Sequence, residues 1–353
     1  MRGINMRIAI IADPYVDIPP KKYGGTELVI HNLIKGLIEN GHQPTLFGTK
    51  GSEVDCELVS IAQKNVFFPR TSSELPLFNQ RIKLINRRTA TKLQKRINDF
   101  DMIHSHGFDL KEFARYPNIT TLHGPITFSN MRYYLERRKL NYISISENQR
   151  KAYPGLNYVG TVYNGEDPSN FPIIKKPNNY LCFLGRFDEE KAPDLAIQLA
   201  IHLGIPIKLA GKRDFLGYRY FREKIKPYLD HPLVEYLGEL GFDDKIKLIS
   251  HAKCNLHPTY FREPFGLTVM EAAYCGTPTL AIARGAMPEL IEHGRTGMLV
   301  EDFIEGFHAI QNCFDMNREY IAKRSRKKFN YHNMTKSYII AYRKVTKKHS
   351  QTN

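Results

Sequence analysis

The chain has 353 residues, of which 42% are apolar and 25% charged, and its formal net charge is +15. This composition is typical of a folded globular protein with two domains of ordinary size, and it excludes a largely disordered chain. The first apolar run ends at Asp13 and is too short for a signal-peptide core or a membrane span. We therefore expect a cytoplasmic protein that is neither secreted nor held by a membrane helix.

The first half of the chain alternates short apolar runs with helical patterns, which is typical of a parallel α/β sheet. Between the first strand and its helix lies Tyr23-Gly24-Gly25-Thr26-Glu27. Two adjacent glycines allow backbone N–H groups to come close to a ligand, although a plain tight turn fits the same residues. The predicted strands are 6–12, 45–47, 102–104, 120–122 and 142–144, with a helix at 26–39.

A basic segment follows, from Arg81 to Arg96, and it contains no acidic residue. Apolar residues recur in and beside it at helical spacing, which predicts an amphipathic helix. Such a helix either lies peripherally on an anionic membrane, such as the inner face of the cell membrane, or packs its apolar stripe against a core. The stripe consists of Ile82, Ile85, Leu93 and Ile97.

Other binding chemistries find little support in the sequence. No helix-turn-helix, zinc-finger or RNP-type pattern is present, so we expect no nucleic-acid partner. The five cysteines are odd in number and widely spread, which favours reduced thiols, and none has metal-ligand spacing. His104-Ser105-His106 is the nearest metal candidate, and we interpret it as structural. We expect no metal and no cofactor.

Polar, proline-rich residues from Val162 to Asn179 predict a linker, and the α/β alternation resumes after it. The predicted strands of the second half are 180–184, 207–209, 234–236, 254–257 and 279–282, and a helical segment covers 316–348. The first of these strands leads into Gly185-Arg186 and then Lys191, ahead of a helix near Pro193. Ligands bind at such strand ends in open α/β sheets, and two cations there suit a diphosphate.

Glu263 and Glu271 flank the most informative segment, which includes Phe265-Gly266-Leu267. Pro264 and Gly276 predict the first turn and the end of one helix. The two carboxylates would then lie on the order of 10 Å apart along the helix axis, at a helix start that attracts anions. A diphosphate flanked by two sugars fits this layout. A capping Glu263 and a solvated Glu271 fit it as well.

The residues around this segment run in the order strand, helix, strand and glycine-rich turn, through 252–258, 260–278, 278–282 and 285–297. This order resembles glycosyltransferase family 4, and the resemblance extends from Met6 to about Tyr342. It implies the α/β GT-B fold, in which two Rossmann-like domains face a central cleft and the C-terminal helix crosses back to the first domain. We expect residues 1–164 to bind the acceptor, 165–335 to bind the donor, and 336–353 to form the returning helix.

The resemblance also implies roles for matching residues. His123, at a predicted strand end, resembles a family histidine that contacts the donor sugar, and Arg186 and Lys191 resemble the pair that stabilises a leaving diphosphate. The implied catalytic residues are His123, Arg186, Lys191 and Glu263; the implied donor-binding residues are Gly25, Gly185, Phe265, Gly266, Leu267, Thr268 and Glu271; the implied acceptor-binding residues are Tyr23 and Gly24.

The activity that the resemblance implies is transfer of a hexose from a nucleotide diphosphate sugar to a glycan or a lipid-linked acceptor. Family members act with retention of the anomeric configuration and without a metal, and a UDP-sugar is the favoured donor. Two alternatives remain open. The chain could be a GT-B epimerase or phosphorylase, or it could be a catalytically silent GT-B protein that binds carbohydrate or serves as a membrane scaffold.

Overall fold

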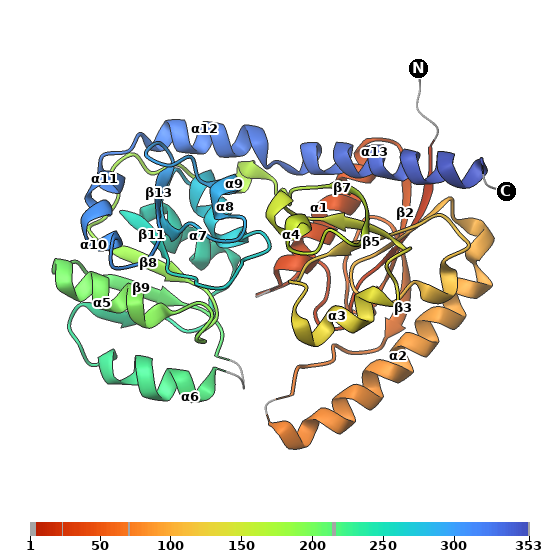
Figure 1. Ribbon diagram of the computed structural model, residues 1–353, viewed down its shortest axis with the longest axis horizontal. Helices are drawn as coiled ribbons and strands as arrows, with labels where there is room; N and C mark the ends of the chain where they lie inside the picture. The colour runs from red at the N-terminus through yellow and green to blue at the C-terminus, as the bar shows by residue number, and fades with distance from the viewer. Residues whose placement is uncertain (1–4, 23, 70, 214–216, 352–353) are drawn as a thin grey trace. The chain divides into compact units, whose positions relative to one another are not determined.

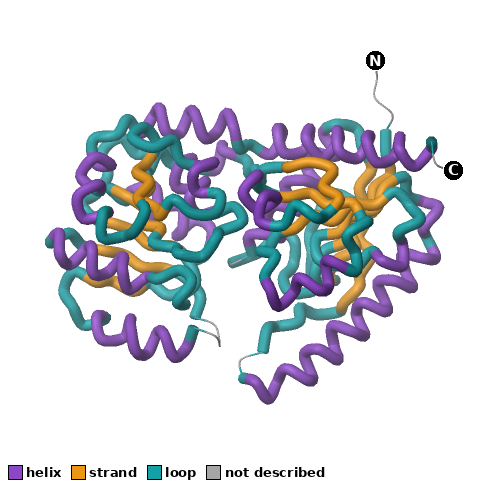
Figure 2. Tube along the Cα trace, viewed as in Figure 1, coloured by secondary structure: helices purple, strands orange, loops and turns teal. Residues whose placement is uncertain are grey.

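The computed structural model describes residues 5–22, 24–69, 71–213 and 217–351. The chain forms two compact units: unit 1 comprises Met1–Glu166 with Tyr331–Asn353, and unit 2 comprises Asp167–Asn330. Each unit is built on a parallel sheet with helices packed around it (Figures 1 and 2). None of the helices in the described residues has the length and apolar content that a bilayer span requires.

Unit 1 contains a seven-stranded sheet in the order β3-β2-β1-β4-β5-β6-β7 among the described residues. Its centre is almost completely buried, because β1 and β4 carry apolar side chains on both faces. The strands are β1 (Arg7–Ile11), β2 (Gln43–Thr49), β3 (Glu57–Ala62), β4 (Met102–Ser105), β5 (Asn118–Leu122), β6 (Asn141–Ser144) and β7 (Asn157–Thr161). The helices are α1 (Gly25–Glu39), α2 (Leu75–Lys95), α3 (Phe128–Leu135), α4 (Glu147–Ala152) and α13 (Tyr331–Ser350).

Unit 2 contains a six-stranded sheet in the order β10-β9-β8-β11-β12-β13, counted over its described residues. Its core includes Phe183, Phe187 and Leu256. The strands are β8 (Leu181–Leu184), β9 (Ile207–Ala210), β10 (Val234–Tyr236), β11 (Cys254–His257), β12 (Thr279–Ile282) and β13 (Gly297–Val300). The helices are α5 (Pro193–Leu203), α6 (Tyr218–Tyr220), α7 (Phe242–His251), α8 (Leu267–Tyr274), α9 (Met287–Leu290), α10 (Gly306–Ala309), α11 (Gln311–Phe314) and α12 (Arg318–Lys328).

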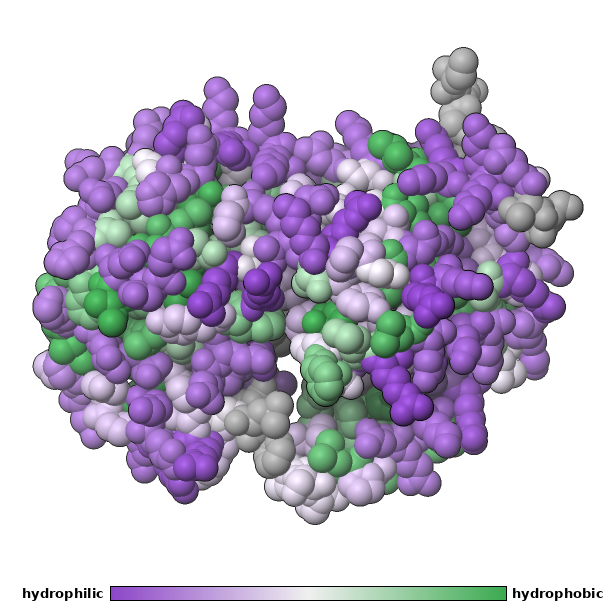
Figure 3. Space-filling view, viewed as in Figure 1, coloured by the Kyte–Doolittle hydropathy of each residue, from purple (hydrophilic) through white to green (hydrophobic). Residues whose placement is uncertain are grey.

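The C-terminal segment, predicted as one helical stretch, is two helices. α12 belongs to unit 2, and α13 belongs to unit 1, where it packs on α1. Helices α1 and α13 pack so closely that a Cβ on Gly36 would lie 2.1 Å from the Thr335 hydroxyl oxygen. The return of the last helix to the first domain, which the GT-B fold implies, is therefore confirmed. Hydrophilic side chains cover α12 and α13 on the face shown in Figure 3.

The basic segment from Arg81 to Arg96 forms the greater part of α2, as predicted, but its apolar stripe faces the protein. Leu93 is fully buried, Ile97 is 7% exposed, and both belong to the core of unit 1. Ile85 packs against the same core. Toward its N-terminal end, α2 exposes apolar side chains to solvent: Leu77 is 52% exposed and Leu84 is 56% exposed. The stripe itself is therefore occupied by the fold and does not offer a lipid-binding face.

Candidate active site

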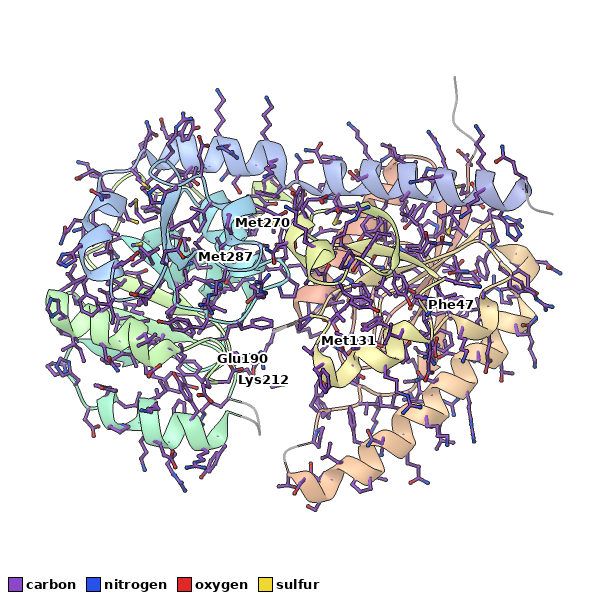
Figure 4. All side chains as sticks on the ribbon, in the orientation of Figure 1. Phe47, Met131, Glu190, Lys212, Met270 and Met287 are labelled. Atoms are coloured by element: carbon purple, nitrogen blue, oxygen red, sulfur yellow. The ribbon has the colours of Figure 1, made fainter. Side chains whose placement is uncertain are left out.

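The carboxyl ends of the parallel strands in unit 2 carry most of the predicted site residues. Strands β8, β11 and β12 are neighbours in the sheet, so the loops that follow them lie at one edge. Open α/β sheets bind ligands at this edge. Figure 4 labels Glu190 and Lys212 in two adjoining loops there, where the Phe187 N–H donates to the Lys212 carbonyl at 3.0 Å.

The loop after β8 holds the two predicted cations in a tight turn. The Lys191 backbone N–H donates to the Asp188 carboxylate at 3.0 Å, and Ala192 adopts a left-handed conformation with φ of 46°. Proline at 193 then begins α5. Arg186 forms ion pairs with Asp188 at 2.8 Å and Glu190 at 2.9 Å. The turn fixes Lys191, and local carboxylates hold Arg186.

Lys191 and Glu263, predicted separately, form an ion pair between their side chains. Both side chains are about five-sixths buried, at 15% and 16% exposed. Burial by itself would raise the pKa of Glu263, but the positive charges of Lys191 and of nearby groups outweigh burial and hold that pKa below its usual range. Glu263 is therefore ionised at neutral pH, and the pair presents a cation and an anion together.

The backbone of Glu263 is fixed by the turn after β12. The Ala286 N–H donates to the Glu263 carbonyl at 2.9 Å. Gly285 has a φ of +59°, and a Cβ there would lie 2.4 Å from both the nitrogen and the carbonyl oxygen of Glu263. Only glycine allows two backbone segments to come this close. The glycine-rich turn that completed the sequence motif thus positions the Glu263 carboxylate.

His257 lies at the end of β11, and the sequence analysis missed it. Its Nε2 is 4.0 Å from a carboxylate oxygen of Glu263. Burial, followed by the charge of Lys191, lowers the pKa of His257 to about 4, so this imidazole is neutral at pH 7. A histidine at the carboxyl end of a predicted central strand was the signal that could have identified it.

Glu271 lies within α8, as predicted, and its carboxylate pairs with Lys245 of α7. Glu271 is 3% exposed, so the solvated alternative is wrong. One carboxylate oxygen meets Lys245, and the other, Oε2, is buried and has no hydrogen-bond partner among the described residues. Lys245 was missed because it belongs to no motif. The only signal was that a buried carboxylate needs a cation nearby.

The helix between the two glutamates begins later than predicted. α8 starts at Leu267, because Gly266 has a φ of +101° and cannot continue a helix backwards to Pro264. A Cβ on Gly266 would lie 2.6 Å from the end of Met287, which Figure 4 labels. The predicted end is confirmed, since Gly276 has a φ of +74°. The first N–H groups of α8 therefore follow a glycine turn.

The donor-binding residues predicted around this helix start differ in what their side chains do. Phe265 is 2% exposed and packs edge-on against Phe329 at 5.9 Å between ring centroids, so its side chain belongs to the buried core. Leu267 and Thr268 are half-buried in the first turn of α8. Gly185 is the first residue of the loop after β8, and its N–H donates to the Ala210 carbonyl at 3.1 Å.

The predicted site residues of unit 1 lie at the equivalent edge of the other sheet. Gly24 and Gly25 open α1, and His123 directly follows β5. Tyr23, which precedes these two glycines and was also predicted to bind a ligand, lies outside the described residues. His106, which directly follows β4, was set aside in the sequence analysis as structural, and its Nδ1 is 2.8 Å from His123 Nε2. The structure thus adds a second histidine to this edge of unit 1.

Two carboxyl groups join this edge in unit 1, and the sequence analysis did not assign either. Asp13 follows β1, and Glu27 lies in the first turn of α1 with 8% exposure. Burial, followed by the charge of Glu27, raises the pKa of Asp13 to about 7. A Cβ on Gly107 would lie 2.2 Å from the Asp13 carboxylate, so the chain after His106 packs directly against it. Perturbed carboxyls at such an edge are candidates for ligand contact.

Two acidic residues near β4, Asp99 and Asp101, form ordinary ion pairs. Asp101 pairs with Arg7 at 3.0 Å, and Asp99 pairs with Arg96 at 2.9 Å, both on the surface. In the described part of the chain, no group of three or more His, Cys, Asp or Glu side chains is arranged to hold a metal ion. The cation–carboxylate pairs are therefore the candidate groups of unit 2, and the histidine pair is the candidate group of unit 1.

Comparison with solved structures identifies the fold. Sucrose-phosphate synthase from Thermosynechococcus elongatus matches with a TM-score of 0.77 and 18% identity over 97% of this chain and 99% of its own. Anabaena Alr3699/HepE, solved with UDP-glucose, matches with a TM-score of 0.69 and 17% identity over 94% of this chain and 98% of its own. The fold is that of the GT-B glycosyltransferases.

Family comparisons identify the chain more closely. Residues 23–158 match the family Glycosyltransferase Family 4, and residues 166–312 match Glycosyl transferases group 1. An uncharacterized glycosyltransferase of Methanocaldococcus jannaschii is 22% identical and is covered over 98% of its length, with 96% of this chain aligned. The chain belongs to the family 4 type of glycosyltransferases.

Proposed function

We propose that this glycosyltransferase moves a hexose from a nucleotide diphosphate sugar to a glycan or a lipid-linked acceptor, with retention and without a metal. The observation that carries the proposal is the pair of buried, cation-paired carboxylates, Glu263 and Glu271, on either side of the α8 start. An anion at that start would meet free backbone N–H groups, and each carboxylate would accept hydroxyl hydrogens from one end of the ligand.

Each residue has a role in the proposed complex. Glu271 Oε2, buried and without a partner among the described residues, would accept hydrogen bonds from the ribose hydroxyls. Glu263 and the backbone at 265–267 would hold the transferred sugar, and His123 would position it. Lys191 and Arg186 would stabilise the leaving diphosphate, which removes the need for a metal.

The proposed reaction occurs on one face of the sugar. The bond from the anomeric carbon to the phosphate oxygen breaks, and a bond to the acceptor oxygen forms on the same side. The proton of the acceptor hydroxyl passes to the departing phosphate oxygen, so no side chain is required as a nucleophile. We favour a UDP-sugar as donor, with support from the Anabaena protein of the same fold that was solved with UDP-glucose.

Ligand-dependent thermal stabilisation tests the donor site. A nucleotide that binds only the folded protein raises the melting temperature by mass action. We expect a shift with UDP that exceeds those with GDP, ADP and CMP, and its loss in Glu271→Gln. Glu235→Gln is the matched control, because Glu235 also pairs with a lysine, Lys208, but is 54% exposed on an edge strand. No shift with any nucleotide would contradict the proposal and favour the silent scaffold.

Product analysis separates the remaining alternatives. A transferase consumes the sugar nucleotide only with a sugar-containing acceptor, an epimerase isomerises it without one, and a phosphorylase needs inorganic phosphate. We expect UDP release that depends on an acceptor and a product with the anomeric configuration of the donor. Acceptor-independent isomerisation, or turnover that requires phosphate, would overturn the assignment.

A second part of the proposal concerns the exposed end of α2. Residues 75–95 contain no acid, and Leu77 and Leu84 are exposed beside Arg81 and Lys83. We propose that this end contacts anionic lipid headgroups. Co-sedimentation with vesicles of phosphatidylglycerol should exceed that with phosphatidylcholine, and Leu77→Ser with Leu84→Ser should reduce it. Equal sedimentation with both lipids would contradict this contact.

A further inference from the structure

Three histidines gather at one edge of the sheet in unit 1. His104 lies on β4, His106 follows it, and His123 follows the adjacent strand β5. The His104 and His106 rings lie 4.1 Å apart between centroids, and the His106 and His123 rings lie 5.1 Å apart with an interplanar angle of 23°. His104 and His106 are 0% and 4% exposed, whereas His123 is half-buried.

Each of these rings carries a single proton at neutral pH. Burial lowers the pKa of His104 to about 3 and that of His123 to about 4, and it holds the pKa of His106 well below its usual range. The hydrogen bond between His106 Nδ1 and His123 Nε2, at 2.8 Å, therefore has one proton between two neutral rings. Two tautomeric arrangements satisfy it, and they differ in what His123 offers to a ligand.

The surroundings of His106 choose between the two arrangements. His106 Nε2 is buried, and no described residue forms a hydrogen bond with it. If His123 were the donor, the proton of His106 would sit on Nε2 as a buried N–H without an acceptor. Buried donors without partners are rarer than buried acceptors without partners. The remaining arrangement places the His106 proton on Nδ1, where it is donated to His123.

We propose that His106 is a positioning residue that fixes the proton of His123 on Nδ1. His123 then acts as a neutral hydrogen-bond donor toward a ligand oxygen, such as a sugar hydroxyl, and not as a base. Resting on the function proposed above, this assignment adds the protonation state of one residue and the second side chain that sets it. His106 itself does not touch substrate in this arrangement.

The surrounding hydrogen bonds hold the pair in place. His104 uses both of its ring nitrogens, Nδ1 with the Tyr342 hydroxyl and Nε2 with the Thr121 hydroxyl, each at 2.7 Å. The His106 backbone N–H donates to the carbonyl of Ile11 at 2.9 Å on the central strand. Because His104 is occupied on both sides, it cannot supply a partner to His106 Nε2, and its ring instead packs against that of His106.

Nitrogen-15 NMR of the histidine rings in the substrate-free protein tests the assignment directly, since a protonated and an unprotonated ring nitrogen have different chemical shifts. Loss of signals in His123→Gln identifies the resonances of His123. We expect His123 to be protonated on Nδ1 and unprotonated on Nε2 throughout pH 6 to 8. Protonation on Nε2 would overturn the proposal, whatever the activity of the protein.

Substitutions at His106 provide the second readout. His106→Asn retains an N–H near the Nδ1 position and should keep the His123 tautomer and most of the turnover. His106→Leu removes the donor, so the His123 proton should move to Nε2 and kcat/KM should fall by roughly five- to tenfold. A merely structural role predicts an unchanged tautomer in both variants, and that result would contradict the proposal.

His42→Leu is the matched control. His42 is 6% exposed in the same unit, and its Nδ1 accepts the Met6 N–H at 3.1 Å, so the variant also loses a buried histidine hydrogen bond. It should lower the melting temperature by a similar amount and leave the His123 tautomer unchanged. A Nδ1–H tautomer in a protein that transfers no sugar would leave this inference standing and remove the proposed function, so the two failures are distinguishable.

Discussion

The site edges of the two units use opposite electrostatics. In unit 2 the buried carboxylates of Glu263 and Glu271 are each paired with a lysine, so full charges persist inside the protein. In unit 1 the buried histidines are neutral, and the carboxyl of Asp13 has a pKa raised to about 7. Paired charges suit a charged ligand, whereas neutral donors suit hydroxyl groups. On this ground we propose that unit 2 binds the diphosphate end of a donor.

Loss of the lysine in the first charge pair should have the largest effect. Lys191→Ala removes a cation from beside the buried Glu263 carboxylate and from the proposed leaving group. We expect turnover to fall by more than tenfold while the circular dichroism spectrum stays that of the wild type. Lys208→Ala is the control, because Lys208 forms an exposed pair with Glu235 in the same unit. Wild-type turnover in the Lys191 variant would remove its assigned role.

The backbone that holds Glu263 offers a second way to test the charged edge. Gly285→Ala would force a Cβ to within 2.4 Å of the Glu263 backbone at a positive φ. We expect a loss of about 2–4 kcal/mol in the free energy of unfolding and weaker donor binding. Gly294→Ala has a similar φ of +77° but no atom within 4 Å of the new Cβ, so it should cost only about 1 kcal/mol. Equal costs in denaturant titrations would show that crowding at Glu263 is unimportant.

These site positions show how far sequence reasoning reaches. The central strands and both glutamates were predictable, because buried strands read as apolar runs and the glutamates flank a helix with clear end signals. Strands β3, β7 and β13 were missed, and all three are sheet edges. In β3 and β7 few positions are fully buried, so the apolar signal is weak, whereas β13 is mostly buried but only four residues long and begins with glycine. Lys245 was not predictable, since only tertiary packing brings α7 beside α8.

Ionisation of Asp13 would add a charge to the edge of unit 1 at which the histidines are neutral. Its folded-state pKa of about 7 lies above its ordinary value of 3.8, so the neutral carboxyl stabilises the fold fully below pH 3.8, and this contribution is lost as the pH rises through 7. Asp13→Asn cannot ionise. The stability of the wild type relative to the variant should therefore decline by up to about 1.4 kcal/mol per pH unit between pH 4 and 7. If urea unfolding gave the same pH dependence of stability for the wild type and the variant, the raised pKa of Asp13 would be contradicted.

The smallest expected effect concerns the Tyr342 hydroxyl, which forms a hydrogen bond with His104. Tyr342→Phe removes the oxygen 2.7 Å from His104 Nδ1, and we expect a loss of about 1 kcal/mol in the free energy of unfolding. Ser337→Ala removes an exposed hydroxyl from the same helix and should change stability by less than about 0.5 kcal/mol. The cost for Tyr342→Phe should be the same at pH 6 and pH 8, because His104 has a pKa of about 3 and stays neutral at both. A cost that grows between these values would mean that His104 gains or loses a proton there, and the neutral character of the edge in unit 1 would then fail.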